Sequence, residues 1–501
     1  MNAADVKRAA ALIDNSNLAP FLNEAIENAA VKSGRPRELP VRTLLIALAH
    51  LSTTGTMHLS RIPAMLNGLD SQSKINLGIT RANGVTRRQV ENLYNLICEV
   101  LDDPDLARFD EFCDMLTESS LPPEVSASKS IAIDSTDIDS WGRDRRPRPN
   151  RARRNTDPDA RWRRKSKDNP WKRAVFGYEL TTAVVVPEIN GPSVPLAARR
   201  IRFRAAGVRT VEMGVQVARG CHAAQGGLND IIADRLYSAS NTGMEFALPM
   251  RALGASPVIA MQQRQLGVLN TVHGALIIDG QPFSPATPLA LRVITPPAVG
   301  APAADYIAYQ QQIALRSIYA MVPHGAPRAD GSQVYKCPAA AGKILCPLQA
   351  SPANSAPGLM PALSAPASVA PNSVCSRKYT TFQAVDIPLA QRDLHGSHKW
   401  FVSWSRRSLV EGFYGNLKNE ACENLNRGTI RVRGLVKTGL LVAFAVASAN
   451  IRLHTAFLNR TPLTKKGTAR KKIGRPRNNS LIQSITVNLD VAANAPPITT
   501  R

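Results

Sequence analysis

Residues 404–418 have the sequence WSRRSLVEGFYGNLK, and this segment is the most informative one for both fold and function. At about 100° per residue, its aromatic and charged side chains fall within roughly 60° of one helix stripe on either side of the glutamate. These side chains are Trp404, Arg407, Glu411, Tyr414 and Lys418. The pattern predicts a helix that begins at about 404, runs through Leu417 and displays an acid between bases. Intrahelical ion pairing, such as Arg407 with Glu411 at i and i+4, would give the same pattern, so a purely structural role is left open.

The first of two further acids follows a short apolar run. Ile131 and Ile133 alternate with smaller residues, as in a strand, and the run ends at Asp134. Asp137 and Asp139 follow closely and compete for the same role. Asp134 is the preferred choice because it directly ends the predicted strand, whereas the other two would lie in the following turn or bulge.

The second further acid, Asp234, stands where another predicted strand, 228–233, stops. Before it, the pattern predicts a strand at 201–205 and a helix at 211–223. Alternating strands and helices indicate an α/β fold with a mixed sheet covered by helices, and ligand sites usually lie at strand ends. Three converging acids would suit in-line phosphodiester transfer, because two metal ions held by carboxylates stabilise charge on the attacking and leaving oxygens.

Taken together, these motifs resemble those of bacterial insertion-sequence transposases of the DDE type. The spacing Trp404-x2-Arg407-x3-Glu411-x6-Lys418 is similar to the Tyr-x2-Arg-x3-Glu-x6-Lys signature of that family, with a tryptophan in place of its tyrosine. Tryptophan keeps a flat face and one N–H donor but lacks the hydroxyl. The family's first acid lies in an Asp-Ser-Thr-like sequence and its second in Asp-x-x-Tyr. In the same order, this chain has Asp134-Ser135-Thr136 and Asp234-Arg235-Leu236-Tyr237.

The resemblance covers residues 130–455 in scattered blocks and implies both a fold and an activity. The implied fold is an RNase H-like mixed sheet flanked by helices, with an N-terminal helical domain and a subdomain inserted between the second Asp and the Glu. The implied catalytic residues, which would bind Mg²⁺ or Mn²⁺, are Asp134, Asp234 and Glu411. The implied contacts to double-stranded DNA are Arg407, Lys418, Trp404 and Tyr414. The implied reaction is DNA strand cleavage and strand transfer at the ends of an insertion sequence, by a homodimer that binds transposon ends and target DNA.

Two other functions remain open from the residues. A nuclease with an RNase H fold would use the same acids but only hydrolyse DNA. A noncatalytic DNA-binding protein derived from a transposase would keep the fold without needing all three acids.

The charge of the chain favours nucleic acid as its partner. Lys and Arg number 62 against 38 Asp and Glu, a net charge of +24, which attracts polyanions. The segment 143–173 holds fourteen Lys or Arg against four Asp, so Arg163, Arg164 and Lys165 are predicted to contact a DNA backbone. A solvated linker would have the same composition.

A second basic pair, Arg87 and Arg88, opens a predicted helix. Thr86 and Gln89 fit a capping box at its start. The two arginines are predicted to contact DNA phosphates, and a dimerisation helix with a solvated first turn is the alternative.

Two tetrapeptides and the cysteines are less specific. Gly-Arg-Pro-Arg occurs at 34–37 and at 474–477, where Arg475 is predicted to enter the DNA minor groove. An ordinary turn and a nonspecific basic tail are the competing interpretations. The seven cysteines indicate reduced thiols. Because their spacing matches no compact ligand pattern, loop or core thiols are favoured over a zinc site built with His395 or His398 for Cys337, Cys346 and Cys375.

Composition divides the chain into five predicted segments: a helical DNA-binding or dimerisation domain (1–125), the first part of the core (126–240), an insertion with an Ala/Pro/Ser-rich stretch (241–395), the last core helices (396–460) and a basic tail (461–501). The start has no pattern of a signal peptide. The run Leu440 to Ala449 is far shorter than the ~20 residues of a membrane span. These features predict a soluble protein of the bacterial cytoplasm, associated with the nucleoid and not with a membrane.

Overall fold

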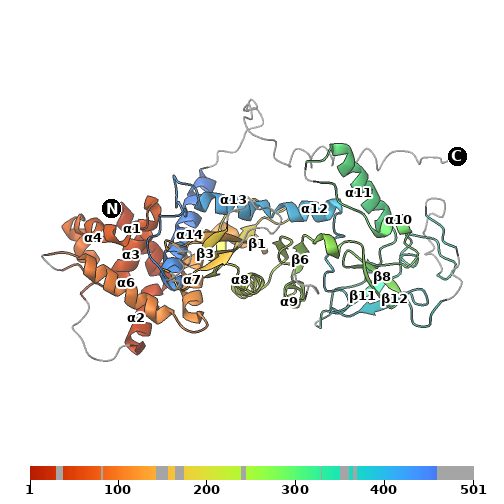
Figure 1. Ribbon diagram of the computed structural model, residues 1–501, viewed down its shortest axis with the longest axis horizontal. Coiled ribbons are helices and arrows are strands. Elements are labelled where there is room, and N and C mark those ends of the chain that lie inside the picture. Colours follow the sequence, from red (N-terminus) through yellow and green to blue (C-terminus); the bar gives the residue numbers. More distant parts are fainter. Residues whose placement is uncertain are drawn as a thin grey trace, which may run out of the picture. The chain divides into compact units, whose positions relative to one another are not determined.

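The computed structural model describes residues 1–29, 38–80, 83–142, 156–163, 174–238, 244–298, 300–328, 330–349, 360–364 and 369–459 (Figure 1). Contacts divide the chain into two compact units. Unit 1 contains Met1–Asp234, Leu253–Ala255 and Arg406–Arg460, and unit 2 contains Arg235–Ala252 and Ser256–Ser405. The N-terminal helices therefore share a unit with the first and last parts of the predicted core.

Unit 1 begins with helices, as the sequence predicts. The helices are α1 (Ala3–Ser16), α2 (Leu18–Ala29), α3 (Val41–Leu51), α4 (Ile62–Asn67), α5 (Ser71–Asn76), α6 (Arg87–Leu101) and α7 (Ala107–Ser119). The capping box at the start of α6 is confirmed, because Thr86 and Gln89 exchange hydrogen bonds between side chain and backbone. The apolar positions of α6 then face inward, and Val90, Leu93 and Ile97 are buried.

A mixed sheet follows the helices and confirms the α/β class. Its strands in unit 1 are β1 (Ser130–Asp139), β2 (Arg161–Arg163), β3 (Val175–Val186), β4 (Ala198–Ala205) and β5 (Asp230–Ala233). β3 pairs antiparallel with β1 on one side and with β2 and β4 on the other, whereas β5 pairs parallel with β1. Within unit 1 the spatial order is therefore β4, β3, β1, β5.

Helices cover both faces of this sheet (Figure 1). On one face lies α8 (Thr210–Gln225), where the Thr181 hydroxyl contacts the Met213 sulfur and also bonds to Ser135. On the other face lies α13 (Ser408–Leu417), which is contacted from β1 by Asp134 and Thr136. This division follows from the strand itself, because successive side chains alternate between the two faces.

The last helix, α14 (Leu435–Leu458), packs against β4, α3, α6 and α7. Gly439 allows this close approach, since a Cβ there would lie 2.5 Å from Phe109 and 2.7 Å from Phe203. In the described part of the chain, α14 is long and apolar enough to cross a membrane by composition, but 61% of its apolar window is buried in the fold. The packing of α14 is therefore that of a core helix.

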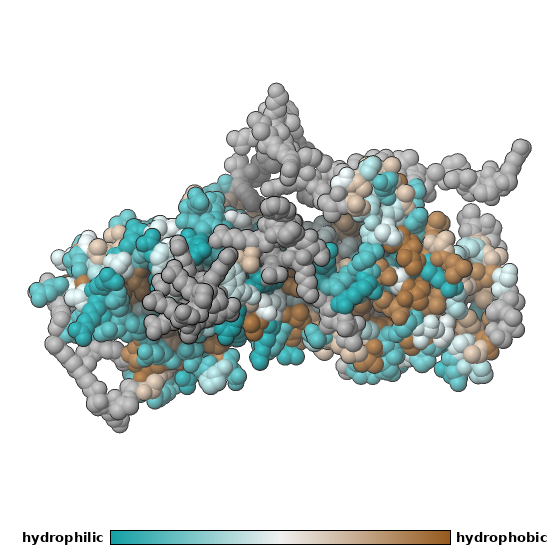
Figure 2. Space-filling model, viewed as in Figure 1, coloured by the Kyte–Doolittle hydropathy of each residue, from teal (hydrophilic) through white to brown (hydrophobic). Residues whose placement is uncertain are grey.

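Unit 2 contains two three-stranded antiparallel sheets and several helices. One sheet is built from β7 (Val268–Val272), β8 (Ala275–Ile278) and β9 (Gln281–Phe283), and the other from β10 (Val322–Pro323), β11 (Gln333–Lys336) and β12 (Tyr379–Phe382). The remaining elements are β6 (Ser256–Ile259), α9 (Ala247–Ala252), α10 (Leu289–Arg292), α11 (Ala303–Ser317) and α12 (His398–Ser405). Figure 2 shows apolar residues gathered on the visible face of this unit. Leu289 and Val293 are exposed. Of the predicted Ala/Pro/Ser-rich stretch, 350–359 and 365–368 lie outside the described residues.

Candidate active site

The parallel pairing of β1 and β5 makes Asp134 and Asp234 neighbours. Ile133 on β1 is the register partner of Ala233 on β5. The residue after each partner is one of the two aspartates, and adjacent strands lie about 4.8 Å apart. Their proximity also has an electrostatic effect, since the charge of Asp234 raises the pKa of Asp134. The two acids, far apart in sequence, therefore meet at one point of the sheet.

The reason for choosing Asp134 over its two neighbours was wrong, because β1 does not end there. The strand runs to Asp139 and pairs with β3 along its whole length. Alternation within the strand separates the acids instead: Asp137 and Asp139 lie on the face opposite to that of Asp134. There, Asp137 pairs with Arg163, whose guanidinium also contacts the buried Glu179 at 2.5 Å. Asp134 is consequently the acid of β1 that faces α13.

Arg407 connects the third acid to the first. One of its nitrogens, Nη1, lies 3.0 Å from Oδ2 of Asp134, and the other, Nη2, contacts Oε1 of Glu411. The Glu411 side chain is 55% exposed, whereas that of Arg407 is 16% exposed. Like Asp234, Glu411 acts on Asp134 by raising its pKa. Asp134 thus lies in the electrostatic field of both Asp234 and Glu411, and binding of a metal by the three acids stays a prediction.

The surroundings of Asp134 raise the pKa of its carboxyl above the ordinary value. Burial is the largest effect and raises the pKa of this carboxyl to about 6. The Ser135 N–H, which donates to Oδ1 at 2.8 Å, and the Arg407 guanidinium lower the pKa, while Asp234 and Glu411 raise it further. A cation that binds here would offset both the cost of burying the charged carboxylate and the repulsion between the acids.

Tyr414 and Lys418, both predicted to contact DNA, hold α13 on the sheet. The Tyr414 hydroxyl donates to the carbonyl of Asp134 at 2.5 Å, and the side chain is buried. The Lys418 ammonium donates to the Thr136 hydroxyl at 2.6 Å and to the Asp137 carbonyl at 2.9 Å. These bonds position the helix that carries Glu411, and a role on DNA stays a prediction.

Arg406 is a positioning residue that the sequence pattern missed. Its guanidinium forms an ion pair with Asp230, the first residue of β5, and donates to the Pro187 carbonyl at 2.9 Å. The pair is almost fully enclosed, since the Asp230 side chain is 3% exposed. Arg406 does not lie on the helix stripe of Glu411, so the helical spacing did not predict a role for it. The only indication in the sequence is that it directly precedes Arg407.

The prediction of one continuous helix from about 404 through Leu417 is wrong at its beginning. α12 ends at Ser405, a turn contains Arg406 and Arg407, and α13 begins at Ser408. The two arginines of this turn contact acids of different strands: Arg406 pairs with Asp230 of β5, and Arg407 pairs with Asp134 of β1. Trp404 precedes the turn in unit 2, and its ring stacks on that of Trp400 at 5.5 Å.

The remaining predicted DNA contacts differ in their surroundings. Arg87 and Arg88 are exposed at the start of α6, where Arg87 pairs with Glu91 at 2.7 Å. Arg163 is fixed by its pairs with Glu179 and Asp137. Outside the described residues lie Arg164, Lys165, Arg475 and both Gly-Arg-Pro-Arg tetrapeptides.

The thiols of Cys337, Cys346 and Cys375 line one cavity of about 190 Å³ in unit 2. All three are free. His395, the histidine weighed as their partner, does not line that cavity; it is buried against Trp400, and burial lowers its pKa to about 3.

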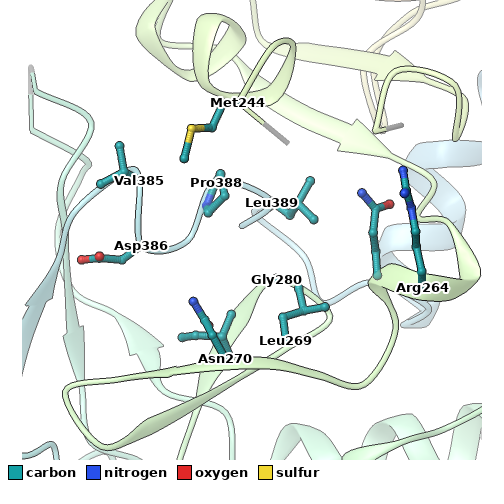
Figure 3. Close-up of a pocket in the computed structure, with 11 residues that line it drawn as sticks. Met244, Arg264, Leu269, Asn270, Gly280, Val385, Asp386, Pro388 and Leu389 are labelled. Atoms are coloured by element: carbon teal, nitrogen blue, oxygen red, sulfur yellow. The ribbon is translucent and has the colours of Figure 1, made fainter. Parts of the chain in front are cut away.

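A larger cavity, of about 330 Å³, also lies in unit 2 (Figure 3). Met244, Leu269 and Leu389 contribute apolar walls. Asp386 supplies the acidic group among its lining residues, and its carboxylate accepts the Gln383 N–H at 3.0 Å. With a single carboxylate, this cavity lacks the acids that metal-assisted phosphodiester chemistry needs.

Among the described residues, no cluster of three or more His, Cys, Asp or Glu side chains is assembled as a metal site. The carboxylates of Asp134, Asp234 and Glu411 nevertheless have the donor chemistry that Mg²⁺ and Mn²⁺ prefer. The guanidinium of Arg407 bridges two of them and thus stands in for a cation. No protein-family model matches the chain, and no curated protein matches it.

Proposed function

We propose that the chain is a DNA transposase of the DDE type with an RNase H-like core. It would cleave DNA at the ends of an insertion sequence and join them to target DNA, as a nucleoid-associated homodimer. The observation that carries this proposal is the convergence of Asp134, Asp234 and Glu411 from two neighbouring strands and a helix.

The topology supports the fold part of the proposal. Strand β1 is central, with antiparallel neighbours on one side and the parallel strand β5 on the other. The first acid lies on β1, the second follows β5, and the third comes from a helix on the sheet after an intervening unit. This order is the one that the family resemblance implies.

Different residues of the chain would bind the metal, position the carboxylates and bind the DNA phosphate. The acids would hold Mg²⁺ or Mn²⁺, which when bound stabilises charge on the attacking and leaving oxygens. Tyr414, Lys418 and Arg406 fix α13 and β5 relative to β1, so the three carboxylates keep their positions. Arg407 presents a planar fork of donors, the geometry that binds a phosphate through two oxygens.

In the cleavage step a water oxygen would bond to phosphorus while the bond from phosphorus to the DNA 3′ oxygen breaks. In the joining step the oxygen of that 3′ hydroxyl would bond to a phosphorus of the target, while the bond from this phosphorus to the target's own 3′ oxygen breaks and leaves a 3′ hydroxyl on the target strand. Asp134 must be ionised in both steps to act as a ligand. Burial and the neighbouring acids oppose this ionisation, and they are the effects that a bound cation offsets.

The test uses the purified full chain with DNA that carries the sequences flanking its coding region, in Mg²⁺ or Mn²⁺. Asp134→Ala and Glu411→Gln are expected to abolish cleavage while gel shifts show unchanged DNA binding. Asp139→Asn is the matched control, because it removes a carboxylate from the opposite face of the same strand and should retain cleavage.

The products separate the possible outcomes. Joining of the cut 3′ end to a target plasmid supports a transposase, whereas hydrolysis alone would identify a nuclease. DNA binding without any metal-dependent cleavage would identify a noncatalytic DNA-binding protein. Normal cleavage by the Asp134→Ala variant would overturn the assignment of that residue.

A further inference from the structure

Arg407 occupies the place between two of the acids that would have to hold a cation. Its two terminal nitrogens are divided between Asp134 and Glu411, so one oxygen of each carboxylate is already engaged. The Asp134 side chain is 20% exposed, and that of Arg407 is 16% exposed. The pairing is therefore sheltered from solvent on the Asp134 side, where water screens it least.

This arrangement makes the guanidinium a competitor of a divalent cation. Both need the same carboxylate oxygens, and both offset the same repulsion between acids. A guanidinium keeps its proton at all physiological pH values, so loss of charge cannot release the oxygens. Only movement of the side chain can free them.

DNA supplies a group that can draw the side chain away. A phosphodiester offers two anionic oxygens at the spacing that suits the guanidinium fork, as a carboxylate does. Arg407 lies in the turn between α12 and α13, directly before the first residue of α13, and its partner Glu411 is largely exposed. An exchange of Glu411 for a phosphate therefore requires no opening of the core.

We propose that Arg407 is a cationic plug, which keeps divalent metal out of the site until a DNA phosphate takes over its guanidinium. Metal loading is thereby coupled to DNA binding, and the protein without DNA is protected from metal-dependent cutting. This inference rests on the proposed function, because it assumes that the three acids form the metal site.

Lys129 provides a matched comparison. It is an exposed cation directly before β1, and its ammonium donates to the carbonyl of Gly226 at 3.4 Å. Removing the charge of Lys129 changes the net charge by the same amount as removing that of Arg407. If the plug is a specific contact and not a general field, only the change at Arg407 will alter metal affinity strongly.

The experiment measures Mn²⁺ binding to the full chain without DNA, by calorimetry and by the electron paramagnetic resonance of free Mn²⁺. Arg407→Ala is expected to bind Mn²⁺ at least about tenfold more tightly than the wild type, the size of one lost charge-assisted hydrogen bond. Arg407→Lys keeps the charge but loses the fork, and should bind more tightly than the wild type. Lys129→Met should bind like the wild type. Thermal melting followed by circular dichroism verifies that each variant folds. If Arg407→Ala does not fold, Arg407→Lys replaces it as the test of the plug.

A short DNA duplex is then added to each protein. Mn²⁺ affinity should rise for the wild type and not for Arg407→Ala, and Asp134→Ala in either background should remove the tight site. A wild type that binds Mn²⁺ without DNA as tightly as Arg407→Ala would refute the plug while leaving the proposed function intact. Mn²⁺ binding that is indifferent to Asp134→Ala would instead refute the metal site, and with it the proposed function.

Discussion

Replacement of Asp134 by asparagine is expected to stabilise unit 1 at pH 8 and to have little effect at pH 4. Burial, Asp234 and Glu411 raise the pKa of this carboxyl to about 6. The folded chain therefore holds the proton more tightly than the unfolded chain does. For an acid with a raised pKa, the free energy of unfolding falls as pH rises through the folded value.

The size of the effect follows from the shift. An ordinary aspartate has a pKa near 3.9, so a value of about 6 corresponds to roughly 2 units, or about 3 kcal/mol at 1.36 kcal/mol per unit. Asparagine resembles the protonated form and avoids this loss. For a unit of this size, about 3 kcal/mol corresponds to a rise of roughly 6–10 °C in the thermal midpoint.

The assay compares thermal midpoints of wild type and Asp134→Asn from pH 4 to pH 8, by circular dichroism. Asp105→Asn, which removes the same charge from an exposed turn, corrects for net charge. The gap between Asp134→Asn and wild type should open as pH rises through about 6. An unchanged or lower midpoint at pH 8, or a gap that does not vary with pH, would refute the reasoning.

Three further substitutions test the surrounding fold. Gly177→Ala should lower the thermal midpoint severely or give insoluble protein, because a Cβ would lie 2.1 Å from the Ile138 carbonyl; a normal midpoint would contradict the pairing of β1 with β3. Asn450→Leu should cost about 2–4 kcal/mol in urea unfolding, since its buried amide bonds both backbone groups of Ala198, and a loss below the measurement error would count against this contact. Tyr414→Phe should cost about 1 kcal/mol in the same assay through loss of its bond to the Asp134 carbonyl of β1, and an unchanged free energy of unfolding would speak against that bond.

Local signals were sufficient for much of the helical part of the fold. The capping box at Thr86 marks the start of α6, and the apolar positions that follow it at helical spacing are buried. Both signals depend on residues within a few positions of one another, so neither requires knowledge of a partner. The strand and helix patterns before Asp234 were likewise close to β4, α8 and β5.

The end of β1 could not be predicted in this way, because a strand's length depends on its partner. Residues 134–137 are all polar, and a run of polar residues after an apolar strand indicates a turn when the sequence is considered alone. β3 offers pairing groups as far as Gly177, opposite Asp139, and the backbone of β1 follows it. The break between α12 and α13 has a similar origin, since Arg406 and Arg407 each find an acid on a different strand.

The predicted helix stripe gave no information on what its side chains contact. Its first residue, Trp404, stacks on Trp400 in unit 2. The side of α13 that faces Asp134 is also the side that packs on β1, so residues beyond Glu411 meet protein: Tyr414 is buried, and Lys418 reaches the backbone of β1. Exposure along this stripe is therefore confined to its beginning, where Glu411 is 55% exposed. The beginning of α13 is also the end at which the helix dipole favours an anion. For the proposed reaction, a DNA phosphate would accordingly have to approach at the start of α13, and the first side chain it would meet beside Glu411 is Arg407.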